Sequence, residues 1–233
     1  MRPLVDTSAR ATAANTAWKA SRSTWKPKPS WGTGRRSKHE GGPGAVPECG
    51  AVLKQRWRAH RLDEVLGDWK PFFDVVENSI RRACKAHGVE YRPSDAAALY
   101  DAIPSWQPHP NVVEILEAIA PHIPLVILSN SMAELIPPSV AHLKAKFHAV
   151  YTAEEARAYK PRMQAFEYMF DQLGCGPDKM MHVSSSFRYD LMTASDLGFM
   201  ARAFIDRGHE PARDGYGVNR LTDVRQLPAL LGL

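Results

Sequence analysis

The strongest constraint on this chain comes from two short hydrophobic runs that each end in polar residues. Residues 125–128 are four consecutive apolar side chains, two of them β-branched, and residues 129–131 (Ser-Asn-Ser) follow directly. A similar run over residues 181–184 leads through a polar turn to Asp190. Short runs of this kind, bounded by small polar residues, predict buried strands.

Polar side chains that follow two parallel strands meet at one place in a fold. The carboxyl ends of parallel strands share one edge of the sheet, and open α/β sheets bind their ligands there. Lys160 lies between the two runs, at a spacing that fits one helical crossover on each side. We therefore expect a site with a hydroxyl from Ser129 and an amide from Asn130. Lys160 would add a cation to this site, and Asp190 a carboxylate.

Strand and helix signals alternate through the second half of the chain. Apolar stretches predict strands over 124–129, 149–152, 180–184 and 201–205, with helical patterns between them. Parallel strands need crossovers of this length, so the chain is predicted to be α/β, with a parallel sheet covered on both faces by helices. Residues 52–104 show helical periodicity without a strand signal, which predicts a separate helical unit.

The positive charge of the chain is confined to its N-terminal part. Residues 1–44 hold nine of the 30 Lys and Arg but only two of the 25 acids, which leaves residues 45–233 with a net charge of −2. Nothing in the globular part forms a basic stripe, so we do not expect nucleic acid as a partner. The composition of residues 1–44 indicates a disordered segment, and it also resembles an organellar transit peptide.

The cysteines and the hydropathy point to a reduced setting away from the membrane. Cys49, Cys84 and Cys175 have no metal-type spacing and leave one cysteine over in any pairing. No apolar run approaches the length that spans a bilayer. We therefore expect a cytoplasmic protein without a membrane partner. A homodimer is one arrangement that the sequence leaves open.

Three ordered motifs give the chain a family resemblance. Leu-Ser-Asn at 128–130, Tyr-Lys-Pro at 159–161 and the serine-rich stretch 184–190 resemble the haloacid dehalogenase superfamily, and its type II 2-haloacid dehalogenase branch in particular. The resemblance implies a Rossmann-like parallel sheet with a helical cap inserted after the first strand. It assigns residues 51–108 to the cap and 109–233 to the α/β core.

The resemblance also implies roles for single residues. Ser129 and Asn130 match residues that bind the substrate carboxylate or phosphate. Lys160 matches the lysine that offsets the charge of the nucleophile, and Asp190 matches the acid that orients this lysine and water. Ser185 belongs to the serine-rich turn and is expected to contact substrate.

A substrate pocket also needs apolar walls. Trp106, in the proline-rich connection between the cap and the core, is expected to line it, and Trp106 or Phe187 would surround the leaving group.

The motif at 184–190 bears on the choice of reaction. Magnesium-dependent phosphatases of the superfamily carry a further acid where this chain has serines, because hard Mg²⁺ prefers carboxylate oxygens. We therefore expect no metal ligand and no cofactor. The expected reaction is hydrolysis of small 2-halo carboxylic acids through an aspartyl ester. A phosphatase, or a non-catalytic protein that retains an anion-binding pocket, are the alternatives.

The first motif of the family, an apolar strand that ends in Asp-x-x-Gly-Thr, is not found in the chain. Asp6 follows Leu4-Val5, but Thr-Ser-Ala-Arg comes next and the apolar run is short. Asp63 and Asp68 lie in the helical stretch and are expected to be solvated. We therefore expect the first core strand to be missing and residues 1–50 to be an atypical tail, either disordered or translated out of frame. A chain without a nucleophile would be inactive.

Overall fold

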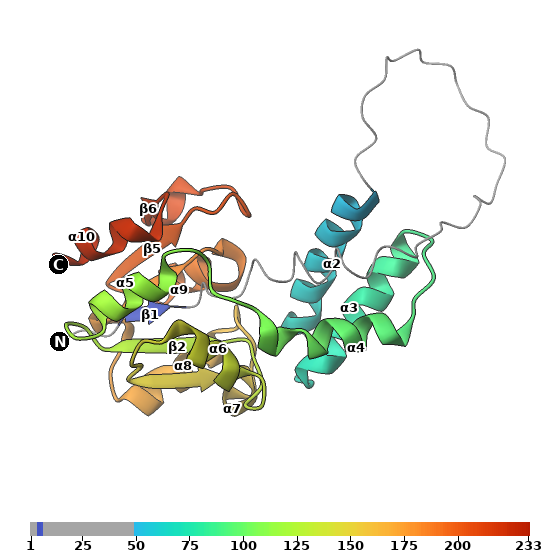
Figure 1. Ribbon diagram of the computed structural model, residues 1–233, viewed down its shortest axis with the longest axis horizontal. Coiled ribbons are helices and arrows are strands. Elements are labelled where there is room, and N and C mark those ends of the chain that lie inside the picture. Colours follow the sequence, from blue (N-terminus) through green and yellow to red (C-terminus); the bar gives the residue numbers. More distant parts are fainter. Residues whose placement is uncertain (1–3, 7–48) are drawn as a thin grey trace, which may run out of the picture.

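The computed structural model describes residues 4–6 and 49–233, with side chains from residue 54 onward. Its centre is a six-stranded sheet in which every neighbouring pair is parallel (Figure 1). In spatial order the strands are β3 (Ala149–Thr152), β2 (Leu125–Ser129), β1 (Leu4–Asp6), β4 (Met181–Ser184), β5 (Ala201–Ile205) and β6 (Asn219–Leu221). The chain is therefore an α/β protein, as the alternation of strand and helix signals predicts.

The prediction that the first core strand is missing is wrong. β1 occupies a central position, with Leu4 opposite both Leu125 of β2 and Met181 of β4. Three residues suffice here because a neighbouring strand on each side completes their backbone hydrogen bonds. The intrinsic signal of so short a run is weak, and tertiary pairing decides its structure. The predictions of a disordered or out-of-frame segment over residues 7–48 lie outside the described residues.

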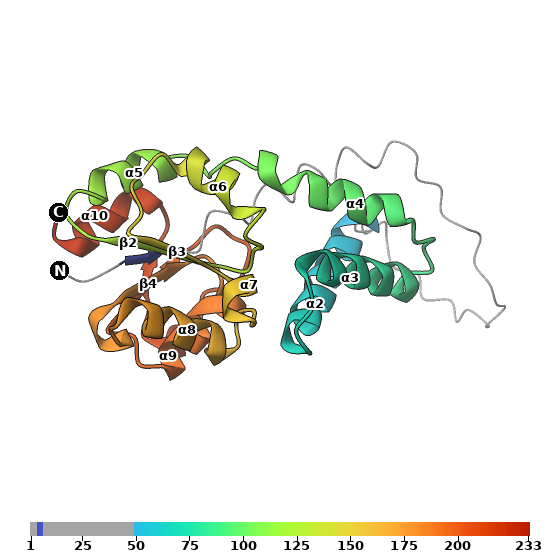
Figure 2. The same ribbon diagram turned by 90° about the horizontal axis from the view of Figure 1, so that it is seen from below.

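Helices cover both faces of the sheet (Figure 2). Alternate side chains of β2 supply the two cores: Leu125 and Ile127 pack on one face, and Val126 and Leu128 on the other. The first face is covered by α5 (Val112–Ile119), α6 (Ile136–Leu143) and α10 (Leu227–Leu231). The second face is covered by α8 (Met163–Leu173) and α9 (Met192–Asp196). Short helices complete the core: α7 (Ala153–Ala156), η4 (Pro177–Lys179), η5 (Phe187–Leu191), η6 (Asp214–Tyr216) and η7 (Val224–Gln226).

Three further helices stand beside the sheet as a separate layer (Figure 2). They are α2 (Cys49–Leu66), α3 (Phe72–Ala86) and α4 (Pro93–Asp101), followed by the short η3 (Ile103–Ser105). Trp57 of α2 lies in their shared core and donates its indole N–H to Ser79 Oγ of α3 at 2.9 Å. A second apolar cluster joins this layer to the sheet domain, with Val65 and Val75 from the helices and Met132 and Tyr159 from the other side.

Tyr159 fixes the junction between the two layers. Its ring stacks on Trp69 with centroids 5.0 Å apart, and its hydroxyl donates to the Lys70 carbonyl at 2.8 Å. Because Tyr159 directly precedes Lys160, this contact ties the predicted lysine motif to the helical layer. In the described part of the chain, no helix is both long and apolar enough to cross a membrane.

Candidate active site

A cavity of about 410 Å³ lies between the helical layer and the carboxyl edge of the sheet. Side chains from α2, α3 and η3 form one wall, and residues that follow β2 and β4 form the other. The structure brings six of the predicted site residues to this one cavity, which is lined by Ser129, Asn130, Lys160, Asp190, Ser185 and Trp106.

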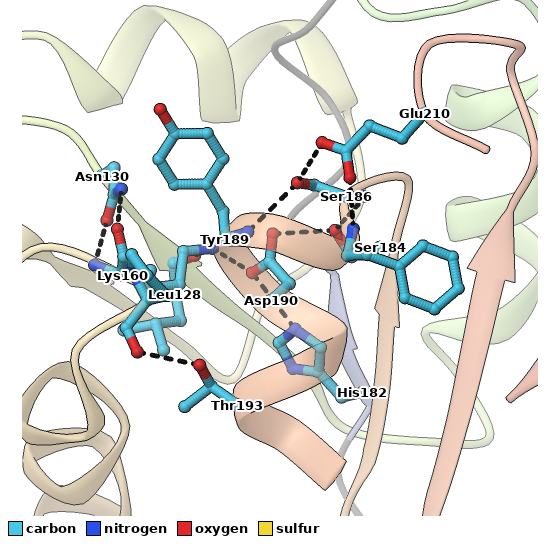
Figure 3. A network of polar contacts seen from close by, with 12 residues as sticks. Leu128, Asn130, Lys160, His182, Ser184, Ser186, Tyr189, Asp190, Thr193 and Glu210 are labelled. Carbon is cyan, nitrogen blue, oxygen red and sulfur yellow. Dashed lines mark hydrogen bonds and ion pairs between the residues drawn. The ribbon is translucent and has the colours of Figure 1, made fainter. Parts of the chain in front are cut away.

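Lys160 and Asp190 form an ion pair inside the protein. Lys160 Nζ lies 2.7 Å from Asp190 Oδ1 and also donates to the Leu128 carbonyl at 2.7 Å (Figure 3). Both side chains are about 5% exposed. A buried pair of this kind is held by geometry and further hydrogen bonds rather than by solvent, so the ammonium group has a defined position at the end of β2.

Asp190 is bound on both of its oxygens. Ser184 Oγ donates to Oδ2 at 2.9 Å, and His182 Nε2 lies 3.2 Å from Oδ1. Burial alone would raise the pKa of Asp190, but the Lys160 cation and the bond from His182 outweigh it and hold the pKa well below its ordinary value. The carboxylate is therefore a fixed anion. Asp190 can orient neighbouring groups at neutral pH but is a poor proton acceptor.

Asn130 joins the end of β2 to the lysine motif. Its Oδ1 accepts from the Lys160 main-chain N–H at 2.7 Å, and its Nδ2 donates to the Lys160 carbonyl at 2.8 Å. One amide hydrogen is left for a ligand, because an Asn side chain has two donors. Both of these bonds go to the main chain of Lys160, so the chief role of the Asn130 side chain in the structure is to position Lys160. The sequence alone did not predict this contact.

The segment after β4 forms an irregular turn, η5, that presents Asp190. Ser186 begins this turn, and its Oγ accepts from the Tyr189 N–H at 3.2 Å. The segment is one π-helical turn, and such turns are frequent at functional sites. Phe187 is fully buried against Phe204, with ring centroids 4.6 Å apart. Of the two residues considered for the leaving-group pocket, Trp106 lines the cavity and Phe187 does not.

Glu210 is a site residue that the sequence analysis left aside. It follows β5, and its carboxylate accepts from Ser186 Oγ at 2.8 Å and from the Phe187 N–H at 2.9 Å (Figure 3). These bonds satisfy donors at the start of the helical segment that carries Asp190. The polar residues from Arg207 to Glu210 follow a predicted strand, and this was the sequence feature that indicated a site residue here. The bonding partner of Glu210, Ser186, lies over 20 residues away in the chain, so the contact itself could not be predicted.

Replacing Glu210 with glutamine is expected to lower the free energy of unfolding by about 0.5–2 kcal/mol. The glutamine side chain would retain one acceptor oxygen where the carboxylate offers two, so one of the bonds to the η5 segment is lost. Urea denaturation at neutral pH measures the change, with Glu117→Gln, an exposed glutamate on α5, as the matched control. Equal stability of the two variants would contradict this role for Glu210.

The helical layer contributes cations that the sequence analysis also missed. Arg58 and Arg61 line the cavity from α2, next to Trp57, and both are partly buried. Arg61 lies over the rings of Trp57 and Tyr189, at 5.0 and 5.7 Å from their centroids. Arg58 and Arg61 are three residues apart on a predicted helix, and this spacing indicates that they share one face of it. Among the side chains that the structure describes, no group of three His, Cys, Asp or Glu is arranged to hold a metal ion.

Comparisons with known proteins point to one family. The model of the haloacid dehalogenase-like hydrolase family matches residues 6–198. The (S)-2-haloacid dehalogenase of Xanthobacter autotrophicus is 26% identical over 162 residues, which are 66% of this chain and 63% of that enzyme. The (S)-2-haloacid dehalogenase 1 of Pseudomonas sp. (strain CBS-3) is 24% identical over 78% of this chain and 84% of its own.

The fold agrees with a solved structure of such an enzyme. L-2-haloacid dehalogenase from Xanthobacter autotrophicus, with chloropropionic acid covalently bound, superposes with a TM-score of 0.72 at 19% identity. The superposition covers 100% of this chain and 98% of the other. This likeness includes the helical layer as well as the sheet.

Proposed function

The chain belongs to the haloacid dehalogenase-like hydrolase family, and we propose that it hydrolyses the carbon–halogen bond of 2-halo carboxylic acids through an ester on Asp6. The observation that carries this proposal is the cavity where Ser129, Lys160 and Asp190 meet at the carboxyl edge of the sheet. The names of the related enzymes support the same reaction.

The position of Asp6 in the backbone makes it the candidate nucleophile. Asp6 is the last residue of the central strand β1, opposite Val183 of β4. The strands on either side end in Ser129 and Ser184, and both of these residues line the cavity. The family match begins at residue 6. Asp6 therefore lies at the sheet edge where ligands of α/β proteins bind, although the Gly-Thr that usually follows the nucleophile is absent.

In the first step, the Asp6 carboxylate attacks the carbon that carries the halogen. The new carbon–oxygen bond forms as the carbon–halogen bond breaks, and the halide leaves with the bonding electrons. A fixed cation at the sheet edge keeps such a nucleophile ionised and oriented, and Lys160 supplies this cation. Ser129 and the remaining amide hydrogen of Asn130 are the donors for the substrate carboxylate, with Ser185 beside them in the cavity wall.

In the second step, water attacks the ester carbonyl of Asp6. The ester opens to regenerate the carboxylate, and the departing oxygen of the 2-hydroxy acid takes one proton. Each turnover thus consumes one water and releases one halide and one proton. Asp190 stays ionised throughout because of its low pKa, and its role is to hold Lys160 in place. Trp106 closes the apolar side of the cavity.

The helical layer would act as the cap of this site. Residues 51–108 supply the cavity wall opposite the sheet, and residues 109–233 together with β1 supply the reacting groups. A cytoplasmic location and a homodimer remain predictions from the sequence.

The proposal is tested by assaying halide release from both enantiomers of 2-chloropropionate in the presence of a chelator. We expect the S enantiomer to yield halide and 2-hydroxypropionate in equal amounts. Phosphate release from p-nitrophenyl phosphate that requires added Mg²⁺, without halide release, would show a phosphatase instead. Folded protein that is silent in both assays would support the non-catalytic alternative.

A further inference from the structure

Two arginines of α2 face the cavity, and neither forms an ion pair with a described residue. Arg58 and Arg61 are three residues apart on the helix and both line the cavity. Neither belongs to an ion pair in the part of the chain that the structure describes. Two guanidinium groups held close together on a partly buried wall repel each other, so a ligand that supplies negative charge there is favoured.

The two acids that line the cavity, Asp190 and Glu210, do not balance the charge of its arginines and lysine. Asp190 is bound to Lys160, and both oxygens of Glu210 accept from the start of η5. Burial lowers the pKa of the Arg58 guanidinium, the neighbouring Arg61 lowers it further, and Glu210 acts in the opposite direction. Arg188 and Arg213 add two exposed cations at the rim. The described lining therefore carries more basic than acidic side chains, and its helical-layer side carries Arg58 and Arg61 without an acid.

The size of the cavity exceeds what a three-carbon acid fills. Its volume of about 410 Å³ falls within the range of roughly 300–1,000 Å³ that holds drug-sized ligands. The donors for one carboxylate, Ser129 and Asn130, lie at the sheet edge, whereas Arg58 and Arg61 lie on the wall that α2 forms. Two groups of anion-binding side chains therefore stand on different walls of one cavity.

We propose that the preferred substrate is a 2-halo acid with a second carboxylate, and that Arg58 and Arg61 bind this distal carboxylate. Guanidinium groups bind carboxylates with two parallel hydrogen bonds, and the rings under Arg61 hold it in place for such a pairing. The inference rests on the proposed function for the reaction, but the dicarboxylate site can be tested by binding alone.

Calorimetric titration with succinate and propionate, which carry no halogen, measures the site independently of turnover. We expect the wild-type protein to bind succinate about 10–100-fold more tightly than propionate, the effect of a charged hydrogen-bond pair. In Arg58→Gln and in Arg61→Gln, we expect most of this preference for succinate over propionate to be lost. Arg56→Gln, an exposed arginine on the same helix outside the cavity, is the matched control and should retain the preference.

Turnover gives the second measurement. The ratio of kcat/KM for 2-chlorosuccinate over 2-chloropropionate is expected to exceed about tenfold and to fall in Arg58→Gln. Equal binding of succinate and propionate, or a preference that Arg58→Gln and Arg61→Gln leave unchanged, would overturn the inference. Halide release from 2-chloropropionate would then still support the proposed reaction. A succinate preference without any halide release would retain the anion site and contradict the reaction.

Discussion

The Asp6→Ala protein is expected to release no measurable halide, with kcat reduced by about 10⁴-fold or more, the scale seen when a covalent nucleophile is removed. Asp6 is the last residue of the central strand β1, and alanine there retains the backbone pairing to Val183 of β4 but removes the attacking oxygen. The steady-state rate of halide release from (S)-2-chloropropionate measures the effect, and circular dichroism checks that the variant is folded.

A matched control separates loss of the nucleophile from a general loss of charge. Asp68 is exposed and lies between α2 and α3, outside the cavity, so Asp68→Ala is expected to retain wild-type turnover. A single turnover of wild-type protein in H₂¹⁸O should place the heavy oxygen in the peptide that contains Asp6 and leave the product unlabelled. Label found in the product alone would mean direct attack by water and would contradict an aspartyl ester.

The strands that could be predicted are those whose own composition determines their structure. The buried run before Ser129 was expected over 124–129 and forms β2 over Leu125–Ser129, and the strand expected over 201–205 forms β5. β1 and β6 are three residues each, and their pairing depends on neighbours distant in the sequence. Such strands carry too little local signal to be recognised from the sequence alone.

The same distinction holds for the residues of the candidate site: those in local sequence motifs were predicted, and those with partners elsewhere in the fold were not. Ser129, Lys160 and Asp190 were found because each belongs to a polar motif near a strand end, and the topology then brings such ends together. Glu210 and the α2 arginines were missed because their partners come from other parts of the fold. The second role of Asn130, which holds the main chain of Lys160, required the backbone geometry of both segments.

The ion pair between Lys160 and Asp190 is expected to contribute to both stability and turnover. Asp190→Asn leaves the buried Lys160 cation without its counter-charge, which should lower the free energy of unfolding by about 3–5 kcal/mol at neutral pH. Turnover is expected to fall by about 10²–10³-fold, the effect of losing one fixed electrostatic group in a site. Urea denaturation and halide release measure the two effects.

The difference in stability between wild type and Asp190→Asn should depend on pH, because folding lowers the pKa of Asp190. A carboxyl with a depressed pKa stabilises the fold fully above the pKa of the unfolded chain, about 4, and this stabilisation is lost as the pH falls through the folded value. The stability gap between wild type and Asp190→Asn should therefore be constant near neutrality and close on acidification. A gap that widened toward acid would contradict the assignment of Asp190 as the ionised partner.

A second substitution distinguishes an unpaired charge from a packing defect. In the double variant Lys160→Met with Asp190→Asn, the unpaired cation is gone, while the asparagine can still bond to Ser184 and His182. Replacing a buried ion pair by uncharged groups is often neutral for stability, so the double variant should be more stable than Asp190→Asn alone. Turnover should not recover, because the cation that holds the nucleophile ionised is absent. Recovery of stability without recovery of activity would separate the structural contribution of the Lys160–Asp190 ion pair from its catalytic contribution. A double variant that is no more stable than Asp190→Asn would show that a packing defect, and not the unpaired charge, accounts for the loss of stability.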